Sequence, residues 1–389
     1  MNLDVIRAEV DEYLRIHLHE NAAAFMLKKH PFQYISNHEL TQQLVGLQKA
    51  RHKFPALFEN HQIIYPPKVN LEQTSSEVTA IYKSQLFEID SMIDLTGGFG
   101  IDVSAFAKVC PITTHVELYS SLQSHAQQLF KAQLIPMKSL CADGIEFLKE
   151  TLDSYDLIYL DPSRKTETNT KAILLKDYEP NVIDHLDLLL NKSKRVMIKT
   201  SPMLDITAGI QQLQKVGSLY VVAVKNEVKE LLWILSDEEV DQITLTCINL
   251  QTEQPVFKTL WSKQGNISYS KPQKYLYEPN AAVMKSQQFD SLMMQYPLGK
   301  LDQDAHLFTA KELIDFPGRV FEIINVVENK PKKLKKLFAK TARGIVTRNY
   351  KESVAQLRKK YQFTEHETDY LFFTSSQELG SIVIEAVKI

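Results

Sequence analysis

Cysteine is scarce in this chain, with only Cys110, Cys141 and Cys247 among 389 residues and no C-x-x-C pair. The sequence therefore excludes a disulfide framework and a zinc site built from thiolates. No apolar run approaches the length of a membrane span, and the net charge of -2 gives no overall attraction to nucleic acid. Asp4 and Glu9 interrupt the apolar residues near the start, which argues against a signal peptide. We expect a cytoplasmic protein that does not associate with membranes.

Histidine is present at eleven scattered positions, which form no set of metal ligands at a credible spacing. We therefore expect no bound metal. Hydrophobic residues make up 44% of the chain and charged residues 24%, which is typical of a globular protein with a large core. The length predicts two or three domains.

Glycine is also uncommon, with 12 residues, yet Gly97, Gly98 and Gly100 stand within four positions. They follow a short apolar run that ends in Asp94 and precede a segment with a helical pattern, so a strand, a turn and a helix are predicted. Such a turn brings bare backbone close to a polar ligand. The dinucleotide fingerprint is only half met, because Val103 occupies its third glycine position. Asp94 suits a ligand with an ammonium group, such as the methionine end of S-adenosylmethionine (SAM); the alternative is a tight turn without a ligand.

Strands and helices are predicted to alternate after a mostly helical region at residues 1–68. The predicted parallel strands are 91–94, 114–117, 139–142, 155–161 and 195–200. The predicted helices are 101–109, 119–133, 144–153, 180–191 and 205–216. Segments 219–225 and 230–235 lie too close together for a helical crossover and predict a terminal β-hairpin. A further pair, 243–250 and 256–261, is a possible extension of this α/β domain.

Four acidic residues fall where the chain leaves the carboxyl edge of the predicted sheet: Asp94, Glu117, Asp143 and Asp161. Ligands of open α/β sheets bind in the crevice at that edge. Glu117 could accept both ribose hydroxyls of a nucleoside, and Asp143 could accept from an adenine amino group. Each of these two could instead cap the next helix. The four acids in sheet order, together with the glycine turn, favour nucleoside binding.

Here the sequence resembles a known family. The matching residues are Asp94-x-Thr96-x-Gly98-x-Gly100, Glu117, Asp143 and Asp161-Pro162, in the order of the motifs of class I SAM-dependent methyltransferases. A closer resemblance, to a bacterial group with a ferredoxin-like segment and a THUMP-like domain at the C-terminus, is carried by further motifs. They are Leu71-Glu72-Gln73-Thr74-Ser75-Ser76-Glu77, Leu160-Asp161-Pro162-Ser163-Arg164, Tyr277-Glu278-Pro279 and Phe316-Pro317-Gly318-Arg319.

The resemblance implies a Rossmann-like α/β fold, SAM as cofactor and a division into four parts. These parts are an N-terminal helical region (1–68), a methyltransferase domain (69–265), a ferredoxin-like segment (274–317) and a small α+β THUMP-like domain (318–389). The residues implied to hold SAM are Asp94, Thr96, Gly97, Gly98, Gly100, Glu117 and Asp143. The residues implied in catalysis are Asp161, Pro162, Ser163 and Arg164.

The acceptor is predicted to be a nitrogen of a base in RNA, either tRNA or rRNA. Many amino-methylating enzymes continue the Asp-Pro pair with proline and an aromatic residue that stacks on the target base. This chain has Ser163 and Arg164 there, and Arg164 could pair with a substrate phosphate or form a structural ion pair. Tyr178 or Tyr82 could supply the missing ring, although an ordinary core or surface tyrosine is the favoured interpretation of each.

Basic residues concentrate between residues 330 and 360, where twelve lysines and arginines accompany a single acid, for a local balance of +11. Aromatic residues are interleaved with them, which favours nucleic acid over a merely solvated face. The predicted RNA-binding residues are Lys335, Lys336, Arg343, Arg348 and Lys351. Two alternatives stay open: a SAM- and RNA-binding protein without turnover, and a methyltransferase of a small molecule or protein.

Overall fold

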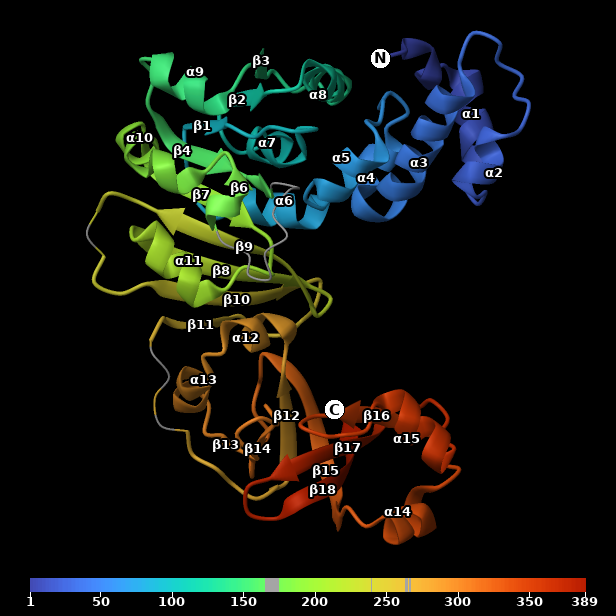
Figure 1. Ribbon diagram of the computed structural model, residues 1–389, viewed down its shortest axis with the longest axis vertical. Helices are drawn as coiled ribbons and strands as arrows, with labels where there is room; N and C mark the ends of the chain where they lie inside the picture. Colours follow the sequence, from blue (N-terminus) through green and yellow to red (C-terminus); the bar gives the residue numbers. More distant parts are fainter. Residues whose placement is uncertain (165–174, 239, 263–264, 266) are drawn as a thin grey trace. The chain divides into compact units, whose positions relative to one another are not determined.

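The computed structural model describes residues 1–164, 175–238, 240–262, 265 and 267–389, and is shown in Figure 1. The chain divides into two compact units. Unit 1 comprises residues 1–217 with 231–241, and unit 2 comprises 218–230 with 242–389. The division falls within the segment 69–265 that the sequence predicts as one domain. None of the helices in the described ranges is both long and apolar enough to cross a membrane.

Unit 1 begins with a helical region. Its elements are η1 (Leu3–Ile6), α1 (Ala8–Ile16), α2 (Ala22–Met26), α3 (Asn37–Lys53), α4 (Pro55–Glu59), α5 (Lys68–Gln73) and α6 (Glu77–Ser84). The longest helix, α3, starts with a capping box in which Ser36 and Glu39 each accept the other's backbone N–H. Its buried face carries Leu40, Leu44 and Leu47. The predicted helical character of this region is confirmed.

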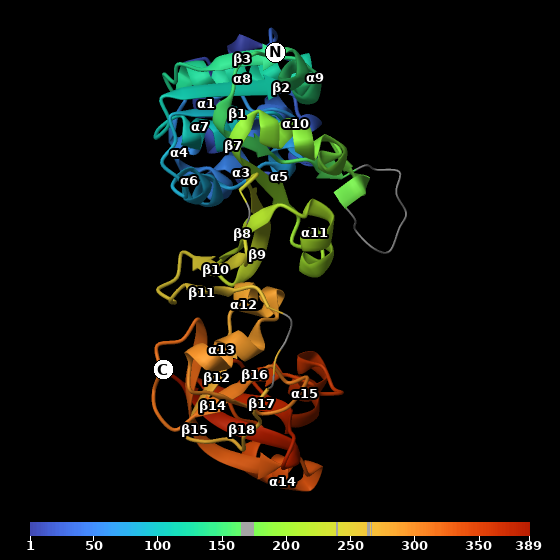
Figure 2. The same cartoon turned by 90° about the vertical axis from the view of Figure 1, so that its left-hand side faces the viewer.

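A mostly parallel sheet follows, in the strand order β9-β7-β4-β1-β2-β3. Its parallel strands are β1 (Ser91–Asp94), β2 (Ile112–Glu117), β3 (Lys138–Cys141), β4 (Tyr155–Leu160) and β7 (Ser193–Thr200). The helices of this part are α7 (Ile101–Phe106), α8 (Ser120–Ala132), α9 (Gly144–Glu150), α10 (Leu186–Asn191) and α11 (Ile206–Leu213). Helix α8 packs on β2 and β3, which Figure 2 shows from the side. Because the central strand β4 is covered on both faces, residues 157–160 are all buried, as an uninterrupted apolar run predicts.

The predicted hairpin is formed by β8 (Val216–Val224) and β9 (Glu227–Leu235), and β9 pairs antiparallel with β7. The predicted α/β fold class, with parallel strands and a terminal antiparallel hairpin, is thus confirmed. One predicted helix is different: segment 180–191 begins as a 3₁₀ turn, η3 (Val182–His185), before α10. Asn181 is the N-cap of this turn, and its side chain accepts the N–H of Ile183.

In unit 2, residues 218–224 of β8 pair in parallel with β10 (Thr244–Leu250), which pairs antiparallel with β11 (Phe257–Leu260). A second sheet has the strand order β13-β14-β12-β15-β18-β17-β16. Its strands are β12 (Tyr275–Pro279), β13 (Gly299–Lys300), β14 (Phe308–Ala310), β15 (Gly318–Glu328), β16 (Gly344–Thr347), β17 (Asp369–Ser376) and β18 (Gly380–Lys388). The helices of this unit are α12 (Ala281–Ser286), α13 (Phe289–Gln295), α14 (Pro331–Phe338) and α15 (Val354–Tyr361).

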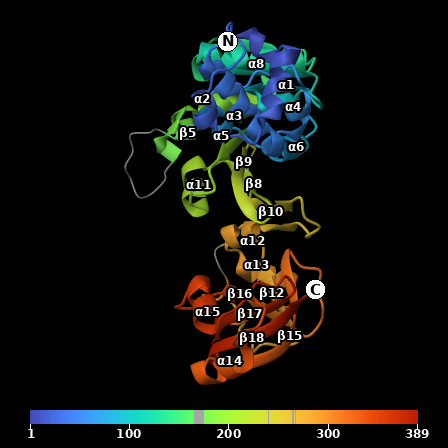
Figure 3. The same ribbon diagram turned by 90° about the vertical axis from the view of Figure 1, so that its right-hand side faces the viewer.

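The two faces of this second sheet hold separate cores. On one face, Leu334 of α14 and Leu357 of α15 pack on Leu371 and Phe373 of β17; Figure 3 shows both helices beside these strands. Phe372 points to the opposite face and packs with residues such as Leu276 of β12. This alternation is the ordinary period of a strand. Because β12 pairs directly with β15, the ferredoxin-like and THUMP-like segments share one continuous sheet.

Candidate active site

The glycine turn lies directly after β1 and has the backbone that only glycine adopts easily. Gly98 and Gly100 have φ values of +56° and +86°. A Cβ atom on Gly98 would meet nothing nearer than 3.8 Å, so this residue faces open space. A Cβ atom on Gly97 would lie 2.3 Å from the ring of His115, which packs against the turn. The turn can therefore admit a ligand at Gly98, whereas Gly97 is needed for packing.

Glu117 and Asp143 both contact backbone N–H groups. The two carboxylate oxygens of Glu117 accept from Gly98 N at 2.9 Å and from Tyr119 N at 2.8 Å. Asp143 is the N-cap of α9 and accepts from Ile145 and Glu146. The capping alternative considered for Asp143 is therefore present, while Glu117 ties the glycine turn to the end of β2. Their predicted contacts with ribose and adenine stay predictions.

Thr96 connects the first and fourth strand ends. Its N–H and hydroxyl donate to Asp94 Oδ1 at 3.0 and 3.3 Å, and its oxygen accepts from the backbone N–H of Asp161 at 2.6 Å. Burial raises the pKa of Asp94 well above its usual range, although the hydrogen bonds from Thr96 act to lower it. Burial also raises the pKa of Asp161, and the ammonium of Lys199 opposes this effect. The structure thus brings Asp94, Thr96 and Asp161 together at one edge of the sheet.

The loop after Asp161 begins as a short strand pair that the sequence did not predict. Strand β5 (Ser163–Arg164) pairs antiparallel with β6 (Tyr178–Glu179), and both Ser163 and Arg164 are exposed. Tyr178 is 3% exposed, so it is a core residue beside this loop, and burial raises its pKa. Pro162 is buried next to Asp161.

A buried charge cluster behind Asp161 contains residues that the sequence analysis did not select. Lys199, at the end of β7, bonds Asp161 Oδ2 at 2.5 Å. Ser75, Lys83 and Asp102 lie behind Lys199 and are all at least nine-tenths buried. The sequence held one clue to Lys199, because it lies one residue before the end of the predicted strand 195–200, at the same edge as Asp161. Ser75 stands within a quoted motif, but its partners come from distant parts of the chain.

The predicted RNA-binding residues fall into two groups. Arg343 forms ion pairs with Asp369 and Glu385, and Arg348 pairs with Glu278, so both arginines have structural partners. Lys335, Lys336 and Lys351 are exposed. Among residues 330–360, seven lysines form no ion pair with the described part of the chain: Lys332, Lys333, Lys335, Lys336, Lys340, Lys351 and Lys359. Four of the seven lie on α14, which buries Leu334 and Phe338 and presents its lysines to solvent.

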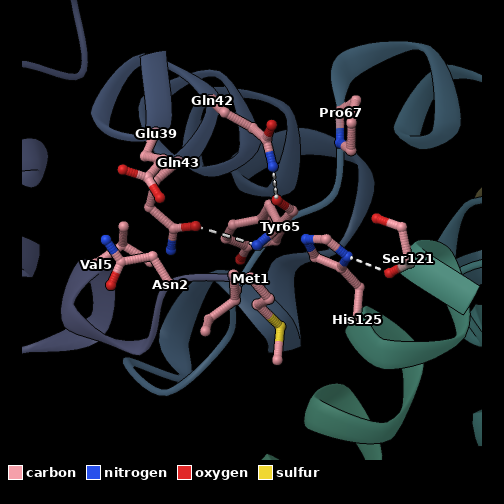
Figure 4. Close-up of a pocket in the computed structure, with 11 residues that line it drawn as sticks. Met1, Asn2, Val5, Glu39, Gln42, Gln43, Tyr65, Pro67, Ser121 and His125 are labelled. Atoms are coloured by element: carbon pink, nitrogen blue, oxygen red, sulfur yellow. Dashed lines mark hydrogen bonds between the residues drawn. The ribbon is translucent and has the colours of Figure 1, made fainter. Parts of the chain in front are cut away.

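Unit 1 also contains a polar pocket of about 200 Å³ between the N-terminal helices and α8 (Figure 4). Gln42 donates to the carbonyl oxygen of Tyr65, Gln43 accepts from the N–H of Tyr65, and His125 donates to the carbonyl oxygen of Ser121. None of the residues predicted to bind SAM or to act in catalysis lines this pocket. In the parts of the chain that are described, no group of three or more His, Cys, Asp or Glu side chains could hold a metal ion.

Comparison with known proteins identifies the C-terminal part and the overall fold. Residues 275–317 match a family described as a ferredoxin-like domain, and residues 318–387 match one described as THUMP domain-like. The crystal structure of a predicted methyltransferase from Porphyromonas gingivalis W83 has a TM-score of 0.88 and 26% identity, covering 100% of this chain and 99% of that one. The chain therefore has, over its whole length, the fold of that protein, and it ends in a ferredoxin-like and a THUMP-like domain.

A second solved structure is less similar. It is a predicted class I SAM-dependent methyltransferase from Listeria monocytogenes, with a TM-score of 0.38 and 14% identity, covering 62% of this chain and 94% of that one. No protein of curated function matches the sequence. The P. gingivalis structure and the two family matches confirm the resemblance inferred from the sequence motifs, for the methyltransferase fold and for the two C-terminal domains.

Proposed function

We propose that this protein transfers a methyl group from SAM to a nitrogen of a base in tRNA or rRNA. The observation that carries the proposal is the hydrogen bond between Thr96 Oγ1 and the backbone N–H of Asp161. This bond joins the glycine turn, which suits the cofactor, to the Asp161-Pro162 loop, which suits an amine. The P. gingivalis protein, similar along the whole chain, is itself described as a predicted methyltransferase, which supports the same activity.

The residues around the glycine turn fit SAM. A Cβ atom on Gly98 would meet nothing nearer than 3.8 Å, and the buried carboxyl groups of Asp94 and Glu117 accept from the N–H groups of Thr96 and Gly98. Thr96, Gly97 and Gly100 hold the backbone of the turn, and Asp143 follows the third strand. When bound, SAM would supply an electrophilic methyl group whose bonding electron pair stays with a neutral sulfur.

Asp161 is the proposed partner of the acceptor nitrogen. Its carboxylate would accept a hydrogen bond from the target amine and orient the lone pair of the nitrogen. The nitrogen gains a methyl group and loses one proton, which the carboxylate is placed to accept. The backbone around Pro162 and the exposed Ser163 and Arg164 would complete the contact with the base and its phosphate.

Calorimetry tests the identity of the cofactor by titrating the wild-type protein with SAM and with NAD, and it tests the site by titrating Gly98→Val with SAM. Valine would strain the positive φ by about 1–2 kcal/mol and would project into the open space before the turn. We expect SAM binding to weaken by about 100-fold or more, about 2.7 kcal/mol. Gly380→Val is a matched control, since Gly380 has φ +71° and no atom within 4 Å of its Cβ position. Wild-type protein that binds NAD but not SAM would contradict the proposal, as would unchanged SAM binding by Gly98→Val.

RNA recruitment is proposed to depend on the lysine face of α14. Reversing Lys332, Lys333, Lys335 and Lys336 to glutamate should weaken RNA binding and reduce the salt dependence of log K by about 0.7 per lost phosphate contact on single strands. The measurement is RNA affinity at several salt concentrations.

A matched control reverses four exposed lysines that are not clustered: Lys108, Lys131, Lys258 and Lys311. Both variants change the net charge equally, so only a local effect distinguishes them. Equal affinity and equal salt slope for wild type and the α14 variant would mean that this face is merely solvated. The alternative of a small-molecule or protein substrate would then gain support.

A further inference from the structure

The segment 71–77 is a sequence motif that the proposed function leaves unexplained. Helix α5 ends at Gln73, and Ser76 caps α6 by accepting the N–H of Thr79. Between the two helices, Ser75 is 5% exposed, so its hydroxyl faces the interior of unit 1. A serine held inside between two helices points to a specific polar partner.

Those partners are charged. Ser75 Oγ donates to Asp102 Oδ2 at 2.7 Å, and accepts from Lys83 Nζ at 2.9 Å and from Lys199 Nζ at 3.3 Å. Lys83 is fully buried and bonds Asp102 Oδ1 at 3.1 Å, while the hydroxyl of Tyr159 donates to Asp102 Oδ2 at 2.9 Å. Although burial acts to raise the pKa of Asp102, Lys83 and Lys199 hold it below its usual range.

Lys199 connects this cluster to the proposed acceptor site. Strands β4 and β7 are parallel neighbours with Leu160 opposite Ile198, so Asp161 and Lys199 leave the sheet side by side. The Lys199 ammonium lies 2.5 Å from Asp161 Oδ2 and is 10% exposed as a side chain. A solvent-exposed ion pair does little to hold its two side chains in place. A charged hydrogen bond with a lysine as buried as Lys199 holds both partners in one geometry.

The charges around Asp161 show what Lys199 contributes. The charges of Lys199, Asp102 and Lys83 act on Asp161, and the Asp161 charge acts in turn on Asp94 and Tyr178. Burial raises the pKa of Asp161, and Lys199 gives the largest opposing effect. Without the Lys199 ammonium, burial and the Asp102 carboxylate would act against the charge of Lys83 and would favour a protonated Asp161.

The lead-in segment also holds a second cation near this cluster. Lys53 Nζ, from the end of α3, donates to the carbonyl oxygens of Leu71 and Glu72. Burial, and then the charge of Lys199, lower the pKa of Lys53 to about 8. The segment therefore links the N-terminal helices to the residues behind Asp161.

We propose that Lys199 is a positioning residue of the methyl-transfer site: its ammonium holds the Asp161 carboxylate in place, and Ser75, anchored by Asp102, holds the ammonium. The inference rests on the proposed function for its catalytic consequence, while the contact itself does not depend on turnover. The motif at 71–77 would then supply the Ser75 hydroxyl, which accepts a hydrogen bond from Lys199 and so helps to hold Asp161.

The first experiment needs no activity. In protein labelled with ¹³C at the aspartate carboxyl carbons, the Asp161 signal is assigned by its absence in Asp161→Asn, and its titration is followed by NMR. We expect the midpoint for Asp161 to rise by at least about one pH unit in Lys199→Met, a tenfold change in the protonation equilibrium. Lys199→Arg should keep the wild-type midpoint, because it retains the charge.

The second experiment measures methyl transfer against pH in the same proteins. The rate of methyl transfer should fall at low pH, and in Lys199→Met this acid limb of the pH profile should move to higher pH, with kcat reduced and SAM affinity unchanged. Lys199→Arg should have the acid limb at the wild-type pH. Ser75→Ala should shift the limb in the same direction by a smaller amount. Ser76→Ala is the adjacent control, since it removes only a helix cap and should leave the pH profile unchanged.

The two experiments separate the two proposals. An unchanged Asp161 midpoint and acid limb in a folded Lys199→Met protein would overturn the role of Lys199 while the methyltransferase activity stands. A shifted midpoint in a protein that transfers no methyl group to RNA would support the contact and overturn its catalytic purpose, together with the proposed function.

Discussion

Asp161→Asn is expected to bind SAM as the wild type does and to lose methyl transfer by about 100-fold or more. The amide keeps the shape of the carboxylate but cannot take a proton, and it presents an N–H₂ group where an acceptor is required. Binding should survive, because the predicted cofactor contacts lie at the ends of β1 and β2, in the glycine turn and in the loop after β3. Calorimetry with SAM and a transfer assay on RNA measure the two properties separately.

Asp156→Asn is the matched control for this change. Asp156 lies near the start of β4 and forms an ion pair of similar length but with a solvent-exposed lysine, Lys194 at 2.6 Å, while accepting the N–H groups of Asp90 and Ser91. Its replacement alters an ion pair of β4 at the edge opposite the proposed site. Transfer at the wild-type rate by Asp161→Asn, or an equal loss in Asp156→Asn, would place the chemistry elsewhere.

Glu278→Ala is expected to destabilise unit 2 by about 2–3 kcal/mol. The Glu278 carboxylate is 4% exposed and receives Arg319 on one oxygen and Arg348 on the other. Arg319 lies directly opposite it on β15, so this carboxylate joins the ferredoxin-like and THUMP-like segments. Removing one partner of a buried ion pair costs about 3–5 kcal/mol, and the partial exposure of both arginines, 32% and 39%, lowers the expected value.

Urea unfolding followed by fluorescence can measure this effect unit by unit. Each unit contains one of the two tryptophans, Trp233 in unit 1 and Trp261 in unit 2, so single-tryptophan proteins report each unit separately. Glu328→Ala is the control, since Glu328 forms a solvent-exposed pair with Lys330 whose loss should cost less than about 1 kcal/mol. An equally small effect of Glu278→Ala would show that the shared sheet does not depend on this carboxylate.

The strands and the acids at their ends could be predicted because both depend on local sequence. A parallel strand covered on both faces is an apolar run, and the residue that follows it necessarily lies at the carboxyl edge. Asp94 and Asp161 therefore meet near Thr96 as the order of motifs implies. The 3₁₀ turn at 182–185 cannot be told from a regular helix by its sequence, because a cap such as Asn181 suits the start of either.

The cluster behind Asp161 and the partners of the basic residues could not be predicted in the same way. Ser75 and Lys199 are 124 positions apart, and no local pattern connects them. A count of charges between residues 330 and 360 likewise omits Glu278, Asp369 and Glu385, which neutralise two of the arginines from other strands. The basic surface is consequently concentrated on the lysines of α14 more than the sequence indicates.

The most direct test of the central claim is the transfer of labelled methyl from SAM to RNA by the full-length wild-type protein. RNA from cells lacking the protein serves as substrate, and the nucleosides are analysed by mass spectrometry afterwards. We predict label on a base nitrogen in tRNA or rRNA, in amounts equal to the S-adenosylhomocysteine released, and none with Asp161→Asn. SAM and RNA binding by the wild type without any label in RNA would contradict the account and favour a binding protein without turnover.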